Sequence, residues 1–193
     1  MGEGWSDWFG LMMTIEAGDS GPDARGIGTW LFGENANGKG MRTYPYSTDM
    51  AVNPHTYNDI KTLSIPHGVG SVWCAMLWEM TWGLIDTYGF DPDFYTGTGG
   101  NNMAMALVIE ALKLQPCSPG FVDGRDALLD ADLALYGGAN AGIIWQAFAK
   151  RGLGVSADQG SSGSRSDGTE AFDMPFPLVS FDDITLFTTE GAG

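Results

Sequence analysis

The chain has 193 residues, which is enough for one domain with a hydrophobic core. Its apolar fraction of 44% and its aromatic fraction of 12% exclude a disordered chain. The formal net charge of -15, from 24 acidic and 9 basic residues, would repel a phosphate backbone, so we expect no nucleic acid partner. The most apolar stretch, residues 68–78, is too short to cross a bilayer, so we expect no membrane association.

The apolar periodicity predicts a mainly α fold of about five helices and one long irregular loop. Residues 3–15 form the first helix, whose start leaves no room for a cap and indicates that the chain is cut from something longer. Residues 16–63, rich in Gly, Pro, Asn and Asp, form the loop, and loops of this length are usually functional. The remaining helices are expected from Ser64, as the cap, to Tyr88 and at about 102–114, 121–136 and 140–151.

Three regions are expected along the chain. Residues 1–152 form the helical lobe, and residues 153–175 form a flexible linker that ends it. Residues 176–193 form an extended tail or the start of an appended domain, with one or two strands between Phe176 and Thr189. Cys74 and Cys117 are expected to be two lone buried thiols. Tryptophans and methionines of the second helix are assigned to the core: Trp73, Met76, Trp78, Met80 and Trp82.

Two carboxylates in the first helix could carry chemistry. Glu3 and Asp7 are four residues apart, so both project from one face about one turn apart. Such a pair can supply one metal ligand and one acceptor that orients a histidine ligand. Two acids at this spacing are more often a solvated face, although their interleaving with Trp5, Trp8 and Phe9 requires part of that face to lie near a core.

The segment 2–9, Gly-Glu-Gly-Trp-Ser-Asp-Trp-Phe, resembles a motif of the fungalysin (M36) metallopeptidases. Further resembling segments follow in family order: 41–57, 96–102, 112–117, 125–132, 138–140 and 147–154. The resemblance implies the C-terminal helical lobe of a secreted, thermolysin-like zinc metalloendopeptidase that acts on peptides or proteins. It also implies that Glu3 is the third zinc ligand and that Asp7 holds a ligating histidine.

Two further residues owe their predicted roles to the same resemblance. The segment 66–73 is similar to a family segment whose histidine donates a hydrogen bond to the oxyanion, which implies this role for His67. A lone histidine at a helix start is otherwise more often structural, and Asp59 is a candidate carboxylate partner for it. Arg42 lies in a place similar to the family's substrate-clamping arginine, the alternative being a surface arginine. His55 is expected at the surface of the loop.

One expected motif is missing from the chain. Peptidases of this type take two zinc ligands and the general base from H-E-x-x-H, whereas the two histidines here are His55 and His67. We therefore expect a missing N-terminal lobe to supply them, and the isolated chain to bind zinc poorly and to be inactive. The alternatives are a non-catalytic helical binding or structural module derived from a peptidase, and a peptide-binding pseudoenzyme with two separately encoded lobes.

Overall fold

The computed structural model describes residues 1–175, and within them it has five α-helices, which confirms the mainly α fold class. The helices are α1 (Gly2–Met12), α2 (His67–Tyr88), α3 (Gly100–Leu114), α4 (Phe121–Tyr136) and α5 (Ala141–Lys150). The strands expected between residues 176 and 189 lie outside the described residues. No helix within residues 1–175 is both long and apolar enough to cross a membrane.

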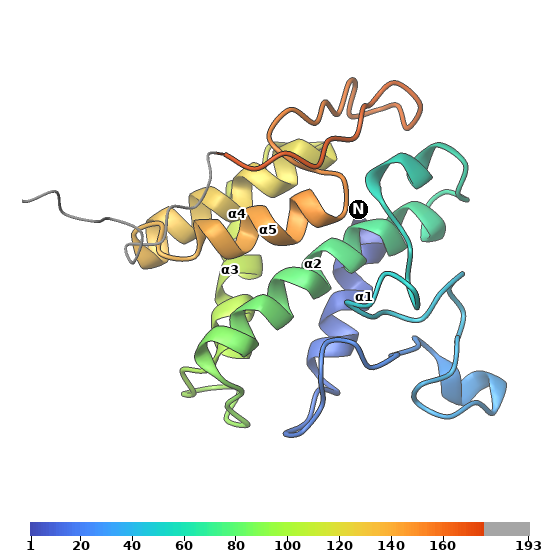
Figure 1. Ribbon diagram of the computed structural model, residues 1–193, viewed down its shortest axis with the longest axis vertical. Coiled ribbons are helices and arrows are strands. Elements are labelled where there is room, and N and C mark those ends of the chain that lie inside the picture. Colours follow the sequence, from blue (N-terminus) through green and yellow to red (C-terminus); the bar gives the residue numbers. More distant parts are fainter. Residues whose placement is uncertain (176–193) are drawn as a thin grey trace, which may run out of the picture.

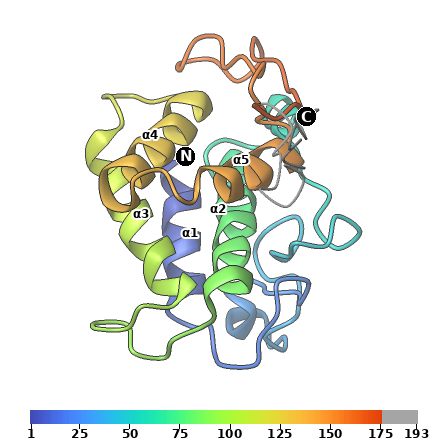
Figure 2. The ribbon, with the colours of Figure 1, turned by 60° about the vertical axis from the view of Figure 1, so that its left-hand side comes forward.

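Helix α2 is the centre of the fold. It runs through the middle of the molecule and packs against α1, α3 and α5 (Figure 1). In Figure 2, α1 and α3 each stand beside α2, while α4 and α5 lie across the upper end of this group. The predicted core residues of α2 are buried, including Trp73, Trp78 and Met80. An apolar helix of this kind is expected to be enclosed on most sides.

Aromatic contacts and one hydrogen bond tie the surrounding helices to α2. The Trp73 ring makes edge contacts with Trp5 of α1 and Phe121 of α4, with centroid distances of 5.1 Å in both pairs. The indole nitrogen of Trp8 donates to the Thr81 hydroxyl at 2.9 Å. The first helix is therefore fixed against α2 along its length, which matters because the predicted site begins on that helix.

Three predicted helix boundaries were wrong by a few residues. Helix α1 ends at Met12 rather than at residue 15, because the amide of Glu16 bonds to the Asp19 carboxylate and starts a turn. Helix α2 begins at His67 with Pro66 in the cap position, so Ser64 is not the cap. Helix α3 begins two residues early, at Gly100, which lies so close to the Leu84 carbonyl that a Cβ would be 2.2 Å from its oxygen.

The region between α1 and α2 is largely irregular, as expected, but it contains two short 3-10 helices that were not predicted. These are η1 (Thr29–Phe32) and η2 (Tyr57–Lys61). Isolated bridges pair Arg25 with Tyr46 and Ile27 with Gly40, so the region folds back on itself. Figure 1 shows it wrapped around one side of α1 and α2 in blue and cyan. Its side chains can therefore reach the first helix.

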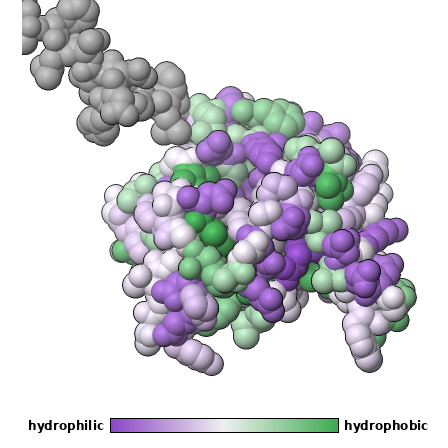
Figure 3. All heavy atoms as spheres, turned by 60° about the horizontal axis from the view of Figure 1, so that its bottom comes forward, coloured by the Kyte–Doolittle hydropathy of each residue, from purple (hydrophilic) through white to green (hydrophobic). Residues whose placement is uncertain are grey.

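Apolar and polar residues are mixed on the surface. The face in Figure 3 carries small green apolar areas surrounded by purple and white residues. Among residues 1–175, the most exposed aromatic residues are Tyr95, at 98%, and Trp30, at 86%. Cys117 is also exposed, so the expectation of two buried thiols holds for Cys74 and is wrong for Cys117, which lies in the turn after α3.

Candidate metal and substrate site

The N-terminal turns of α1 and α2 cross at two glycines. A Cβ on Gly4 would lie 2.3 Å from the Gly70 carbonyl oxygen, and a Cβ on Gly70 would lie 2.6 Å from the Glu3 Cβ. Distances this short exclude any side chain at either position. The two helices therefore approach at backbone contact, and their first turns present Glu3 and His67 at the same end of the fold.

The Glu3 carboxylate lies between a histidine and an arginine from two other segments. Its Oε2 atom is 3.4 Å from His67 Nε2 and 3.6 Å from Arg42 Nη2. Both contacts are longer than an ordinary hydrogen bond of about 2.7–3.2 Å. The Glu3 side chain is 35% exposed and that of His67 is 60% exposed. The carboxylate thus lies beside a guanidinium and an imidazole and remains accessible to a ligand from outside the described residues.

Arg42 is buried and forms a bidentate ion pair with Asp7. Its Nε donates to Asp7 Oδ2 at 2.6 Å, and its Nη2 donates to Asp7 Oδ1 at 2.7 Å. The hydrogen bond to Asp7 raises the pKa of Arg42 further above its ordinary value, so the guanidinium stays charged. Asp7 and Arg42 are 5% and 7% exposed, which excludes the solvated-face interpretation for Asp7 and the surface interpretation for Arg42.

The cluster includes a residue that the sequence analysis missed. The Tyr46 hydroxyl donates to Asp7 Oδ2 at 2.5 Å, and its ring is fully buried. Burial, with Cys74 and Asp7 nearby, raises the pKa of Tyr46 well above its ordinary value, so the hydroxyl keeps its proton. The resembling segment 41–57 contains Tyr46, but nothing in its spacing from Asp7 indicates the contact.

Asp59 is not the partner of His67, contrary to our candidate assignment. Its Oδ2 lies 3.4 Å from Nδ1 of His55, and its carboxylate also accepts the Thr56 amide in the capping box that starts η2. His55 is 3% exposed, so its expected surface position is also wrong. Burial lowers the pKa of His55, and the nearby Arg151 acts in the same direction.

A catalytic zinc site generally needs three protein ligands. Among residues 1–175, no group of three or more His, Cys, Asp or Glu side chains is arranged to hold a metal ion. Glu3 is an accessible oxygen donor of a kind that zinc accepts, and it lies beside a histidine whose imidazole is exposed. The described residues therefore fit zinc as a source of one ligand and do not form a complete site.

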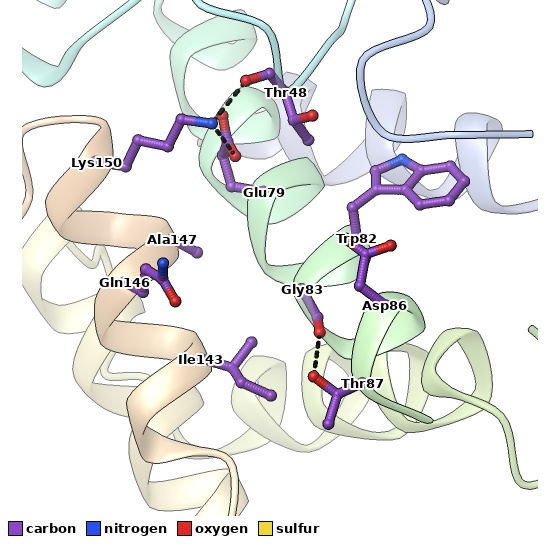
Figure 4. Close-up of a pocket in the computed structure, with 10 residues that line it drawn as sticks. All are labelled: Thr48, Glu79, Trp82, Gly83, Asp86, Thr87, Ile143, Gln146, Ala147 and Lys150. Carbon is purple, nitrogen blue, oxygen red and sulfur yellow. Dashed lines mark hydrogen bonds and ion pairs between the residues drawn. The ribbon is translucent and has the colours of Figure 1, made fainter. Parts of the chain in front are cut away.

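A pocket of about 350 Å³ between α2 and α5 is separate from this cluster. Figure 4 shows Glu79 and Lys150 at one end of it and Asp86 further along α2. Lys150 donates to Glu79 at 2.8 Å and to the Thr48 carbonyl at 2.6 Å. From the rise per residue of an α-helix, Glu79 lies roughly 18 Å along α2 from His67. None of Glu3, Asp7, Arg42 and His67 lines the pocket.

The same ion pair belongs to a buried network that holds the irregular region. Arg151 is fully buried, and its Nε donates to Glu79 Oε1 at 2.9 Å. Its other nitrogens donate to three backbone carbonyls of the loop. The distances are 2.8 Å to Ser47 and 3.1 Å to His55, and the third acceptor is the carbonyl of Asn53. Arg151, directly after α5, therefore fixes the loop segment 47–55, which follows Tyr46 in the chain.

Comparison with known families finds a metallopeptidase match over most of the chain. Residues 1–157 match the family model described as Fungalysin metallopeptidase (M36). The chain therefore belongs to the fungalysin metallopeptidase family, as the resemblance of its motifs implied.

Curated relatives agree with this assignment. The chain is 47% identical over 176 residues to "Extracellular metalloproteinase MEP" of Neosartorya fischeri, which covers 88% of this chain and 27% of that protein. It is 45% identical over 169 residues to the protein of the same name from Pyricularia oryzae, which covers 84% of this chain and 26% of that protein. The chain is 46% identical over 182 residues to "Extracellular metalloproteinase MEP" of Fusarium vanettenii, which covers 91% of this chain and 28% of that protein. The chain thus spans about a quarter of the length of these relatives.

Proposed function

We propose that this chain is part of a secreted zinc metalloendopeptidase that hydrolyses internal bonds of peptides or proteins. The observation that carries the proposal is the convergence of Glu3, Asp7, Arg42 and His67, from three separate segments, at one end of the fold. The relatives' names support both an extracellular location and a metal-dependent proteinase. The remaining ligands and the general base would come from a lobe outside this chain.

Glu3 and Asp7 serve the metal in this proposal. Zinc, when bound, supplies a Lewis acid that polarises the peptide carbonyl. Glu3 is the ligand that this chain contributes, because its carboxylate is oriented by long contacts and remains partly exposed. Asp7 Oδ1 accepts one hydrogen bond, from Arg42, so it retains a lone pair for the N–H of a ligating histidine.

His67 and Arg42 serve the substrate. The His67 imidazole is exposed at the first residue of α2, where it can donate to the oxygen that gains negative charge during attack on a peptide bond. Arg42 uses Nε and one Nη2 hydrogen for Asp7, and the same Nη2 atom lies 3.6 Å from Glu3 Oε2. The two Nη1 hydrogens remain for a substrate carbonyl. The ion pair with Asp7 holds the guanidinium in one orientation before substrate binds.

The test uses the full-length protein and compares two glutamate variants. Glu3→Gln keeps the shape of the side chain and removes the anionic ligand, whereas Glu16→Gln alters an exposed glutamate beyond the other end of α1. We expect Glu3→Gln to lose zinc affinity by more than the roughly 10–100-fold typical of residues that only support a ligand, and to lose peptide cleavage with it. Glu16→Gln should match the wild type in both.

His67→Ala separates the metal role from the substrate role. It should retain zinc, and its kcat should fall by about 10²–10³-fold, as when one oxyanion donor is removed. Equal zinc affinity in Glu3→Gln and Glu16→Gln would overturn the proposal, and so would full activity of His67→Ala.

A further inference from the structure

Tyr46 is a buried side chain of the irregular region that contacts the site and has no role in the function proposed above. Its backbone is anchored by an antiparallel bridge to Arg25, with both N–O distances at 2.8 Å. Its ring is fully buried, and its hydroxyl points at Asp7 Oδ2 at 2.5 Å. The hydroxyl is thus held at a fixed position relative to α1.

Asp7 is the acceptor that joins Tyr46 to Arg42. Its Oδ2 accepts from both Arg42 Nε and the Tyr46 hydroxyl, while Oδ1 accepts from Arg42 Nη2. The terminal torsion of an aspartate is broad and weakly restricted. Two parallel bonds from Arg42 fix the guanidinium against the carboxylate, but they allow the two groups to rotate together. The Tyr46 hydroxyl donates from another direction and prevents this joint rotation.

We propose that Tyr46 is a positioning residue for the peptidase site, whose hydroxyl fixes the rotation of the Asp7 carboxylate and, through it, the orientation of the Arg42 guanidinium beside Glu3. The inference rests on the proposed function, because it takes the substrate-binding role of Arg42 from there. Tyr46 itself touches neither substrate nor metal. Its effect reaches the substrate through Arg42.

A structural role of the Tyr46 ring has to be separated from the role of its hydroxyl. Tyr46→Phe keeps the ring and removes the oxygen. Tyr57→Phe is the matched control: Tyr57 is 3% exposed, lies in the same region, packs on Phe121 and is not among the donors to Asp7 within residues 1–175. Both variants remove one buried or nearly buried hydroxyl from an aromatic ring, but only Tyr46→Phe removes a donor to Asp7.

The experiment measures kcat, KM and melting temperature of the full-length zinc-loaded protein on an internally quenched peptide. We expect Tyr46→Phe to raise KM by about ten-fold, the size of one hydrogen bond to a charged group, with kcat within about two-fold because Arg42 binds ground state and transition state alike. Tyr57→Phe should leave KM unchanged. Because the ring is retained, both variants should melt within a few degrees of each other.

A double-mutant cycle supplies a readout that a purely structural role would not move. If Tyr46 acts through Arg42, then Tyr46→Phe should have no further effect on KM in an Arg42→Ala background. Additive effects of Tyr46→Phe and Arg42→Ala on KM would overturn this inference alone. The same conclusion would follow if Arg42→Ala raises KM while Tyr46→Phe and Tyr57→Phe have equal KM values. An unchanged KM in Arg42→Ala overturns the substrate role of Arg42 in the proposed function, and this inference with it.

Discussion

Arg42 and Asp7, 35 positions apart in the chain, form a buried ion pair in which two guanidinium nitrogens bond to the two carboxylate oxygens. The pair links the irregular region to the first helix at the end where Glu3 lies. Because both groups are removed from water, neither can leave the pair without exposing a buried charge to an apolar surrounding. The Arg42 side of the candidate site is therefore part of the buried fold.

The crossing of α1 and α2 should tolerate no side chain at Gly4. In Gly4→Ala the new Cβ meets the Gly70 carbonyl, which belongs to the backbone and cannot move aside. We expect a loss of about 1–3 kcal/mol in the free energy of unfolding from overpacking. Gly2→Ala is the control, because a Cβ there meets nothing within 4 Å. Chemical denaturation checks both, and a Gly4→Ala variant as stable as Gly2→Ala would show that the helices are further apart.

Arg151 should be among the most sensitive charged positions. Arg151→Met leaves Glu79 with Lys150 as its remaining cation and removes the donors to three loop carbonyls. We expect a destabilisation of about 3 kcal/mol or more, as for other broken buried pairs. Lys113→Met breaks the exposed pair with Glu110 and should cost under about 1 kcal/mol. Urea denaturation of the two variants makes the comparison, and similar losses in both would contradict it.

His55 should make the stability of the fold depend on pH in the mildly acidic range. Burial lowers its pKa from the ordinary value of 6.5, so the unfolded chain takes up this proton first as the pH falls. The contribution of His55 to stability is complete above pH 6.5 or so, declines below it, and levels off once the folded state is protonated as well. Urea midpoints measured across this range should fall less steeply for His55→Gln, whereas identical slopes would refute a titrating His55.

The isolated chain should bind zinc weakly. Glu3 offers one carboxylate, and residues 1–175 provide no cluster of three candidate ligands. A titration of zinc into the tag-free chain, followed by calorimetry, should therefore give no tight stoichiometric binding. A tight one-to-one complex would mean that ligands within the chain rearrange around the metal.

Local pattern was sufficient for most helices, because their apolar faces and glycine or proline ends are encoded in adjacent residues. The helix predicted at 121–136 agrees with α4 at both ends, and Gly137 in the left-handed conformation explains its termination. The pattern was less informative at α1, where Met13 continues the apolar spacing although the helix ends at Met12 and a turn starts at Glu16. That turn depends on the side chain of Asp19, which periodicity does not register.

The site depends on contacts that local pattern does not contain. His55 is buried, and its carbonyl accepts a hydrogen bond from Arg151, 96 positions later; no spacing rule relates the two. Tyr46 reaches Asp7 across 39 positions through the fold of the loop. The resemblance to a family supplied Glu3, Asp7, Arg42 and His67, but it contained neither the three-donor arrangement at Asp7 nor the pairing of Asp59 with His55.

The proposal that Glu3 is a zinc ligand is tested most directly by locating zinc in the full-length protein by anomalous diffraction at the zinc edge. We expect a zinc ion with a Glu3 carboxylate oxygen at about 2.0–2.2 Å and the His67 imidazole nearby but unligated. A fully occupied zinc site with no Glu3 oxygen among its ligands would contradict it.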